Sequence, residues 1–311
     1  MIKKIKLSNI IKVVNNMINQ RIDNFIRSKF NTIPKNKLYK IIRIGYIKVN
    51  KKKIKPNYKL QLGDILHIPY FLVQKKNNNH IILNEKIKKK ILSSIIYEDK
   101  YLLIINKPSG IAVHGGSGLN FGIIESLRLL KLNYKYLELI HRLDRNTSGI
   151  LMLAKKKSSL TYLHQQFRNQ IIKKKYIALV HGNWLKKKII VDQPLIKKIH
   201  NGKKIVTVDK NGKDSKTIFT LKKNFFSNAM VTIEPKTGRT HQIRVHLAYI
   251  GYPIIFDHDY GNKLLDCEIN KNYHSQHMLL HAVSVMFYHP YNNKKTYVYA
   301  PLEKRFKKYL K

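Results

Sequence analysis

Apolar residues recur with helical spacing in two segments near the start of the chain. These segments cover residues 21–26 and 38–43, and Pro34 lies between them. Alternating apolar and polar residues at 46–50 and 64–68 predict two short strands. The pattern therefore predicts a small α/β module at this end of the chain.

A polar stretch follows this module. Residues 74–80 read Gln-Lys-Lys-Asn-Asn-Asn-His, without an apolar period, and the residues after them become rich in lysine. Such composition is typical of a linker, and 311 residues are enough for two domains. The predicted division is an extension over residues 1–18, the small module over 19–72, a linker over 73–92 and a main domain over 93–311.

The main domain mixes strand-like and helix-like segments without strict βαβ alternation. We therefore expect an α+β domain built on a mixed, mostly antiparallel sheet. We find no internal repeat of fixed period. The predicted strands cover residues 95–108, as a pair about a turn, 150–153, 175–180, 231–235, 278–286 and 296–300, and the predicted helices cover 121–130 and 158–169.

Charge indicates the class of partner. The chain has 61 Lys and Arg but 17 Asp and Glu, which gives a formal charge of +44 and a pI near 10.2. This charge is far more than solubility requires, and it predicts a nucleic acid partner. Part of the lysine excess can come from A+T-rich codons, but the remaining positive charge still predicts a nucleic acid partner.

The remaining composition favours a protein of the reducing cytoplasm. Cys267 is the single cysteine, which excludes an internal disulfide framework and a Cys-based zinc site. No apolar run approaches the roughly 18 to 20 residues of a membrane span, and residues 1–8 lack the apolar core of a signal peptide. Two closely spaced histidine pairs lack the acid of a zinc-protease pattern, so we expect no metal. We expect a monomer without a membrane partner.

One segment places a carboxylate between two arginines. Asp144 lies between Arg142 and Arg145, and small residues and then an apolar run follow it. The neighbouring cations favour the ionised acid. On spacing alone, a structural ion pair in a turn and an acid that does chemistry remain open alternatives.

The segment over residues 141–155 resembles the signature of the large bacterial pseudouridine synthase family. It reads His-Arg-Leu-Asp-Arg-Asn-Thr-Ser-Gly and continues into an apolar strand that ends at Ala154-Lys155. The resemblance implies a catalytic domain of pseudouridine synthase type in which Asp144 is the catalytic residue. The family often has aspartate at the position of Asn146, a neighbour that the chemistry does not need.

Two more segments are similar to motifs of this family. Residues 238–246 resemble its third motif, which implies that Arg244 is the ion-pair partner of the catalytic acid and that Ile243 lies under the uracil. Tyr176 resembles the family's active-site tyrosine, whose ring can stack on the base. For Arg239, a phosphate or surface role and a direct catalytic role both stay open.

The implied reaction converts uridine to pseudouridine with all atoms kept, so no cofactor is needed. The N1–C1′ bond breaks, the uracil turns, and its C5 bonds to C1′. Asp144 can act as a nucleophile at C1′ or as a base at C2′, and the sequence does not choose between them.

The target uridine must also leave its stack to be reached. Arg142 is the candidate to fill the gap, because its planar guanidinium can stack or bind phosphate. His141 either contacts the RNA backbone or only holds the turn. The glycine-rich loop over residues 106–118 lacks the Gly-Lys-Ser/Thr ending of a P-loop, which argues against nucleotide hydrolysis.

The small module is similar to the S4 RNA-binding domain. Arg43, Lys40 and Lys48 would lie together near the junction of helix and strand and grip phosphates there. The alternative is a basic capping domain. The resemblance rests on Gly45, Val49-Asn50, Lys55-Pro56 and Gly63-Asp64.

The resemblance extends over almost the whole chain. In the loops at 112–118 and 49–56 it is strongest with the C-type branch of the family, and the D-type branch shares the architecture. It implies several uridines of 23S ribosomal RNA, free or in a large-subunit precursor, as substrates. One other class is an RNA-binding assembly factor without catalysis, against which intact Asp144, Tyr176 and Arg244 argue. The second alternative is a glycosidase that releases the base, and that reaction would need a second carboxylate near Asp144.

Overall fold

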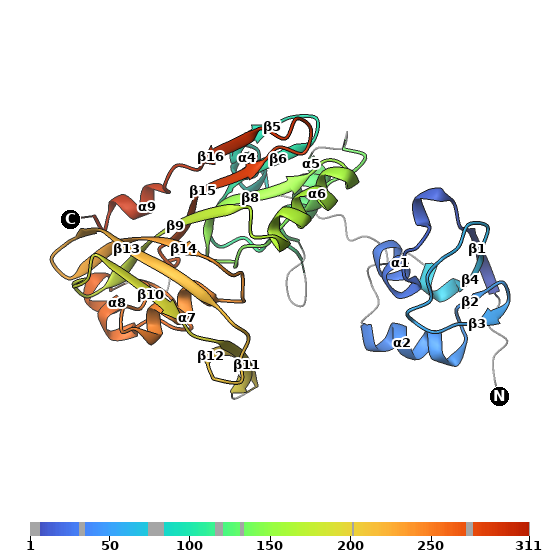
Figure 1. The fold of residues 1–311 in the computed structure, drawn as a ribbon, viewed down its shortest axis with the longest axis horizontal. Helices are drawn as coiled ribbons and strands as arrows, with labels where there is room; N and C mark the ends of the chain where they lie inside the picture. The colour runs from blue at the N-terminus through green and yellow to red at the C-terminus, as the bar shows by residue number, and fades with distance from the viewer. Residues whose placement is uncertain are drawn as a thin grey trace. The chain divides into compact units, whose positions relative to one another are not determined.

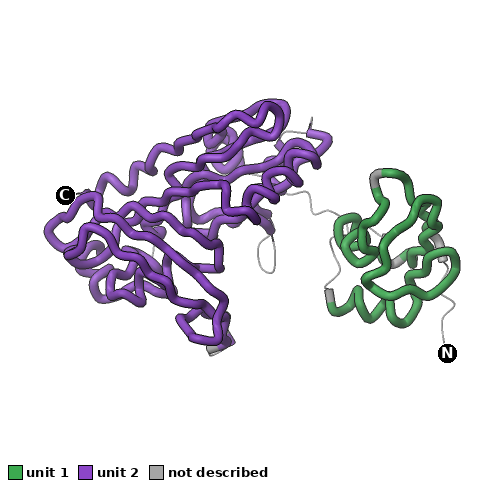
Figure 2. Tube along the Cα trace, in the orientation of Figure 1, with its two compact units in different colours: residues 1–81 green, residues 82–311 purple. Residues whose placement is uncertain are grey.

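The chain folds into two compact units, residues 1–81 and residues 82–311, which we call the small unit and the main unit (Figure 1, Figure 2). None of the described helices is long and apolar enough to cross a membrane. Pro34 and the polar stretch at 74–80 lie outside the described residues. The computed structural model describes residues 7–30, 35–73, 84–115, 121–130, 134–200, 202–271 and 276–310.

The small unit packs two helices and a short helix with a four-stranded sheet of order β1-β4-β2-β3. The apolar stripes of α1 and α2 provide its core, in which Ile22, Ile26 and Ile42 are fully buried, so both predicted helices are confirmed. Gly45 ends α2 with φ +89°, a conformation that favours glycine. The elements are β1 (Leu7–Lys12), a 3₁₀ turn (Asn15–Met17), α1 (Ile22–Lys29), α2 (Lys35–Ile44), β2 (Lys48–Val49), β3 (Lys52–Lys53), β4 (Ile65–Pro69) and α3 (Tyr70–Val73).

Two segments expected outside the domains belong to them. Strand β1 falls in the expected extension, but it pairs with β4 along its length, and the next residue, Val13, is buried in the core. Helix α4 (Glu85–Leu92) falls in the expected linker. Asn84 caps it by accepting the backbone N–H of Lys86 at 2.9 Å, and Ile91 is buried in the main unit. In both segments lysine is so frequent that the few apolar residues that pack into the core do not form a clear pattern in the sequence.

The main unit is built on a ten-stranded sheet with the order β10-β13-β14-β9-β15-β8-β6-β5 (Figure 1). β16 adds to β15, and β7 adds to β8. All of these pairings are antiparallel except that of β15 with β8, which confirms the mixed, mostly antiparallel sheet. The strands are β5 (Ile95–Glu98), β6 (Leu102–Lys107), β7 (Glu138–Leu139), β8 (Ser148–Ala154), β9 (Lys173–His181), β10 (Lys188–Asp192), β13 (Lys216–Asn224), β14 (Asn228–Pro235), β15 (Leu280–Tyr288) and β16 (Lys295–Tyr299).

Helices cover this sheet, and a separate hairpin extends from it. α6 contacts β8 and β15, and α7 contacts β13, β14 and β12. Every residue of β8 is buried, so this strand lies at the centre of the main core. The remaining elements are α5 (Ile123–Leu130), α6 (Lys157–Arg168), β11 (Leu195–His200), β12 (Lys203–Val208), α7 (Gln242–Tyr249), α8 (Lys263–Ile269) and α9 (Lys304–Lys307).

Candidate active site

Strand β15 brings distant motifs together, because it pairs with both β8 and β9. Ala282 of β15 lies opposite Gly149 of β8 and opposite Tyr176 of β9. Gly149 has φ +102°, and a Cβ there would lie 2.2 Å from the carbonyl oxygen of Ala282. Glycine thus permits this close approach. Asp144, in the loop just before β8, is consequently held near Tyr176.

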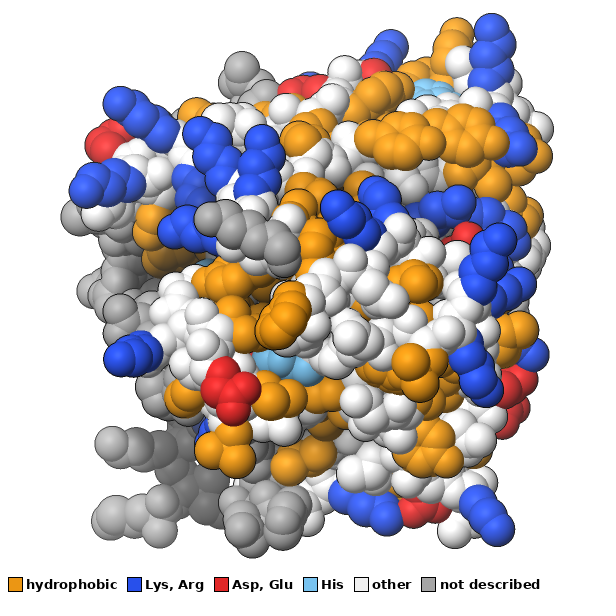
Figure 3. All heavy atoms as spheres, turned by 90° about the vertical axis from the view of Figure 1, so that its left-hand side faces the viewer, with side chains coloured by type: hydrophobic (Ala, Val, Ile, Leu, Met, Phe, Trp, Pro, Cys, Tyr) orange, Lys and Arg blue, Asp and Glu red, His pale blue; other side chains and the backbone are white. Residues whose placement is uncertain are grey.

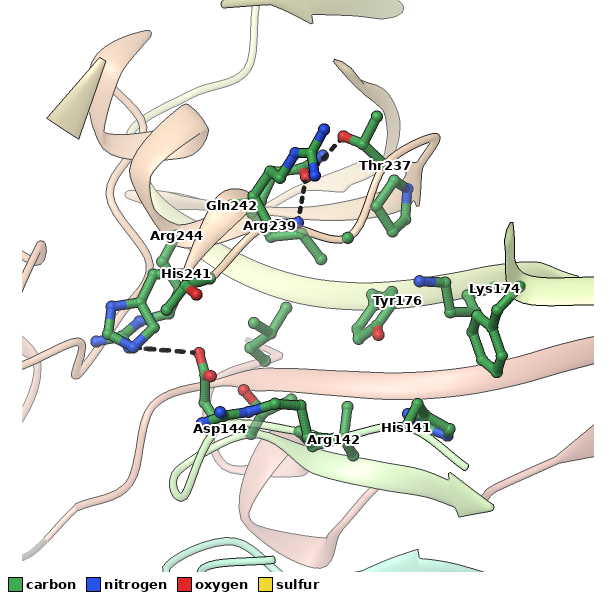
Figure 4. Close-up of a pocket in the computed structure, with 18 residues that line it drawn as sticks. His141, Arg142, Asp144, Lys174, Tyr176, Thr237, Arg239, His241, Gln242 and Arg244 are labelled. Atoms are coloured by element: carbon green, nitrogen blue, oxygen red, sulfur yellow. Dashed lines mark hydrogen bonds and ion pairs between the residues drawn. The ribbon is translucent and has the colours of Figure 1, made fainter. Parts of the chain in front are cut away.

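One cavity of about 290 Å³ contains every site residue predicted in the main unit (Figure 4). Most of its lining comes from three segments: the loop before β8, the start of β9, and the turn that leads into α7 together with the first residues of that helix. Phe167 of α6, Pro235 of β14 and Leu280 of β15 complete it. The predicted residues that line it are His141, Arg142, Asp144, Tyr176, Arg239, Ile243 and Arg244.

The carboxylate of Asp144 is held at one oxygen. Nη1 of Arg244 lies 3.5 Å from Oδ2, and Nε2 of His241 lies 3.8 Å from the same atom (Figure 4). No described residue hydrogen-bonds Oδ1. The side chain is 24% exposed, so an oriented carboxylate remains accessible from the cavity.

The guanidinium of Arg244 is fixed by two further acids that the sequence reasoning missed. Asp257 accepts from Nε at 2.7 Å and from Nη2 at 2.6 Å, and Asp259 accepts from Nη2 at 2.8 Å. Burial disfavours the charge, but these bonds outweigh it and raise the pKa of Arg244 above its ordinary value. Arg244 is therefore a permanent, oriented cation. Two acids in three residues of an acid-poor chain were a usable signal for this cluster.

Tyr176 and Ile243 provide apolar surface in the cavity. Each is 8% exposed, and Leu143 and Leu280 line the same space. Burial, and then the charge of Asp144, raises the pKa of Tyr176 above its ordinary value. The tyrosine therefore stays a neutral phenol at physiological pH.

His141 holds strand β8, which follows the loop that carries Asp144. Its Nε2 accepts the backbone N–H of Met152 at 3.1 Å, and its ring packs on Phe167. Burial, and then the nearby charge of Lys174, lowers the pKa of His141 to about 3, so the ring is neutral. This geometry supports the alternative in which His141 holds the turn. Arg142, by contrast, is exposed at the cavity.

The turn before α7 is stabilised by Gln242, which the sequence reasoning also missed. Its Oε1 accepts from the hydroxyl of Thr237 at 2.7 Å and from the backbone N–H of Arg239 at 2.9 Å (Figure 4). Nε of Arg239 donates to the carbonyl of Asp214 at 3.0 Å, and Arg239 is exposed. Arg239 is thus oriented at the cavity without contacting Asp144.

A short chain of contacts links the hairpin of β11 and β12 to Asp144. The backbone N–H of Val206 in β12 donates to the hydroxyl oxygen of Tyr260 at 3.0 Å, and this oxygen lies 2.9 Å from Nδ1 of His241. When Tyr260 donates to Nδ1, the proton of His241 sits on Nε2 and faces Asp144. His241 has φ +54°, an uncommon conformation for a non-glycine residue that is concentrated at functional sites.

Lys107 fixes the backbone next to the loop that carries Asp144. This fully buried side chain donates to the carbonyls of Pro108, Ile111 and Arg145, each at 3.0 Å. Burial lowers the pKa of Lys107 to about 7. Its place in the glycine-rich loop was visible in the sequence, but its role as an anchor was not.

The predicted phosphate-binding residues of the small unit lie on α2 and β2. Lys40 and Arg43 are exposed, and Lys48 is half-buried. They belong to a different unit from the cavity. Their role in binding phosphate stays a prediction.

Two sequence families match the chain. The RNA pseudouridylate synthase family matches residues 101–249, and the S4 domain matches residues 20–66. Human RNA pseudouridylate synthase domain containing 4 is 26% identical with a TM-score of 0.61, over 72% of this chain and 94% of that chain. Human RNA pseudouridylate synthase domain containing 1, at 22% identity and a TM-score of 0.56 over 67% and 82%, shares the fold. Fold and site together define an RNA pseudouridylate synthase.

Relatives that match along their full length narrow the class. Ribosomal large subunit pseudouridine synthase C of Buchnera aphidicola subsp. Acyrthosiphon pisum is 52% identical over 100% of this chain and 99% of that protein. Its counterpart in Vibrio cholerae serotype O1 is 45% identical over 94% and 93%. The chain belongs to the RNA pseudouridylate synthase family, and it is an isomerase that acts on RNA.

Proposed function

We propose that the chain converts several uridines of 23S ribosomal RNA to pseudouridine, as a C-type enzyme. The observation that carries this proposal is the 52% identity, over the full length of the chain, to a relative named for the large ribosomal subunit. The charge of +44 agrees with it, and Lys and Arg side chains clearly outnumber acids on the face shown in Figure 3. We further propose a cytoplasmic monomer that acts on free RNA or on a large-subunit precursor.

In this proposal Asp144 acts at the ribose of the target uridine. Arg244 holds Oδ2, which leaves Oδ1 for the substrate. Oδ1 either bonds to C1′ as the N1–C1′ bond breaks, or takes the C2′ proton on the way to a glycal. In the first route, C5 of the turned uracil attacks C1′ and releases the carboxylate; in the second, C5 bonds to C1′ and the proton returns to C2′. N1 gains a proton, C5 loses one, and no cofactor is needed.

The detached uracil needs a surface that holds it without bonding to it. Tyr176 and Ile243 supply apolar contact in the cavity, and the neutral phenol offers a ring face on which the base can stack. We assign these two residues to base binding.

Uridine reaches the cavity by leaving its helix, which costs a few kcal/mol. Arg142 is exposed at the cavity and can occupy the vacated position, whereas Arg239 can contact the flanking phosphate. Arg43, Lys40 and Lys48 in the S4 domain would bind phosphates farther along the RNA.

The test is tritium release from 23S rRNA transcript labelled at uridine C5, with the native chain and with Asp144→Asn. Release by the native chain alone supports the proposal, and mapping of the modified positions then separates C-type from D-type targets. Absence of release by either protein, with intact RNA binding and with a subunit precursor also tried, would favour the noncatalytic assembly factor. An abasic site in the product would indicate a glycosidase.

A further inference from the structure

Outside the active site, two turns of the main unit build a short column of side chains. Tyr101 lies in the turn between β5 and β6, and Tyr291 lies in the turn between β15 and β16. Their rings stack with 4.9 Å between centroids and 20° between planes. Nζ of Lys156 lies 4.2 Å from the centroid of Tyr101. Tyr101 is thus enclosed by a ring and a cation, whereas Tyr291 is 70% exposed.

The surroundings of this column are basic. A shallow cavity of about 630 Å³ lies beside it, and Lys100, Lys294 and Lys295 are exposed at its lining. Among the described residues that line the cavity, the acid is Asp99, and its carboxylate is already occupied. It accepts two backbone N–H groups of the β5–β6 turn at 2.7 Å each and pairs with Nε2 of His289 at 2.7 Å. Asp99 therefore leaves the exposed lysines to an outside anion, although Nζ of Lys295 also lies 5.5 Å from the ring centroid of Tyr297.

An exposed, immobilised aromatic ring beside several cations fits an unpaired nucleotide. The base can stack on the ring, and the adjoining phosphates can pair with the lysines. Lysines at this lining outnumber the one acid among its described residues, Asp99, which is already paired, and this favours a polyanion over an apolar protein surface. We propose that the column of Lys156, Tyr101 and Tyr291, with Lys294 and Lys295, is a second RNA-binding surface that takes an unpaired base of the substrate on Tyr291.

The position of this surface sets which nucleotides it can contact. Strand β8 connects the two places, since Asp144 lies in the loop before it and Lys156 follows shortly after it. The seven residues of β8 span roughly 20 Å at about 3.3 Å per residue. Because stacked nucleotides rise about 3.4 Å each, the surface would engage RNA roughly six or more nucleotides from the target uridine. This inference rests on the proposed function, in that the RNA bound is the substrate.

The test compares two RNAs and matched tyrosine variants of the full chain. The RNAs are a long 23S rRNA transcript and a short stem–loop with only the nucleotides next to the target uridine. Tyr291→Ala should raise the Kd and KM for the long RNA about 5- to 150-fold, the usual range for one stacked base, with kcat unchanged. The same variant should bind the short stem–loop like the native chain. Tyr291→Phe keeps the ring and should behave as native.

A control variant and a salt titration test the proposal further. Tyr299→Ala removes a tyrosine of equal exposure, 69%, from the neighbouring strand β16 and should leave both RNAs unaffected. Replacement of Lys294 and Lys295 by Gln should reduce the slope of log K against log salt by about 1 to 2.

Native affinity of Tyr291→Ala for the long RNA would overturn the proposal and leave this face to a protein partner. An equal loss with both RNAs would overturn it as well. If the native chain releases no tritium from any RNA, the proposed function fails, but the Kd comparison still decides the role of Tyr291.

Discussion

Asp257→Asn should show that Asp144, the proposed catalytic acid, depends on a residue that does not contact it. Asp257 is 1% exposed at its side chain and holds two nitrogens of Arg244, at 2.6 and 2.7 Å. Asparagine keeps the shape but removes the charge and replaces one acceptor by a donor. Breaking a buried ion pair on one side costs about 3–5 kcal/mol, because the partner charge stays buried. Arg244 would also lose the orientation that brings Nη1 toward Asp144.

Asp259→Asn is the matched control. It is the same chemical change beside the same guanidinium, at 2.8 Å, but the Asp259 side chain is 29% exposed. Solvent screening limits such a pair to about 1 kcal/mol. The two variants therefore separate burial of the ion pair from mere loss of an acid.

Urea unfolding, followed by tryptophan fluorescence, measures the difference in stability between the two variants in the main unit. Trp184 is the single tryptophan, and it is buried in the main core. With an m value of about 3 kcal/mol/M, a loss of 3 kcal/mol moves the midpoint by about 1 M. Single-turnover tritium release should fall about 100-fold for Asp257→Asn and less than 10-fold for Asp259→Asn, since small misplacements of a catalytic group have effects of this size. Equal midpoints for the two variants, or native turnover by Asp257→Asn, would refute the reasoning.

Changes at three further residues, Lys107, His141 and His241, test other contacts of the site. Lys107→Met leaves three buried or part-buried carbonyls without their donor and should cost about 3–5 kcal/mol in the same urea assay. A native midpoint would contradict its role as an anchor. The pKa of His141 is about 3 in the folded chain against an ordinary 6.5. Below pH 6.5 the unfolded chain therefore binds one more proton than the folded chain, and the free energy of unfolding should fall, by up to about 2 kcal/mol at pH 5. His141→Gln should remove this part of the pH dependence, whereas the change of exposed His258 to Gln should keep it. His241→Gln places an amide N–H near the Nε2 position and should retain the native kcat. His241→Asn tolerates the left-handed backbone but cannot reach Asp144, so its kcat should fall about tenfold. Equal kcat values for the two variants would show that the contact between His241 and Asp144 does not contribute to turnover.

The hydrophobic pattern predicted the elements whose apolar residues face one side. Strands β6, β8, β9 and β15 and helices α1, α2, α5 and α6 all occur near their predicted positions. Helix α7 was not predicted, although it carries Arg244, because all residues from Gln242 to Leu247 are buried and no polar face marks the helical period. The hairpin of β11 and β12 was also missed, because its lysines interrupt the alternation of apolar and polar residues that would mark two strands.

The site shows a different limit, which comes from the way buried polar groups are satisfied. Asp144, Tyr176 and Arg244, which line the cavity, each lie in a short sequence motif, so each could be selected from its own motif. Their supports are satisfied by partners that are distant in the chain. His246, fully buried beside them, hydrogen-bonds Ser215 and Thr217 of the β13 region and ties α7 to the sheet. In a sequence, such a residue looks the same as an exposed one, because burial and pairing are properties of the fold. The geometry of Arg244 therefore depends on contacts that no single segment encodes, and the Asp257 comparison tests that dependence directly.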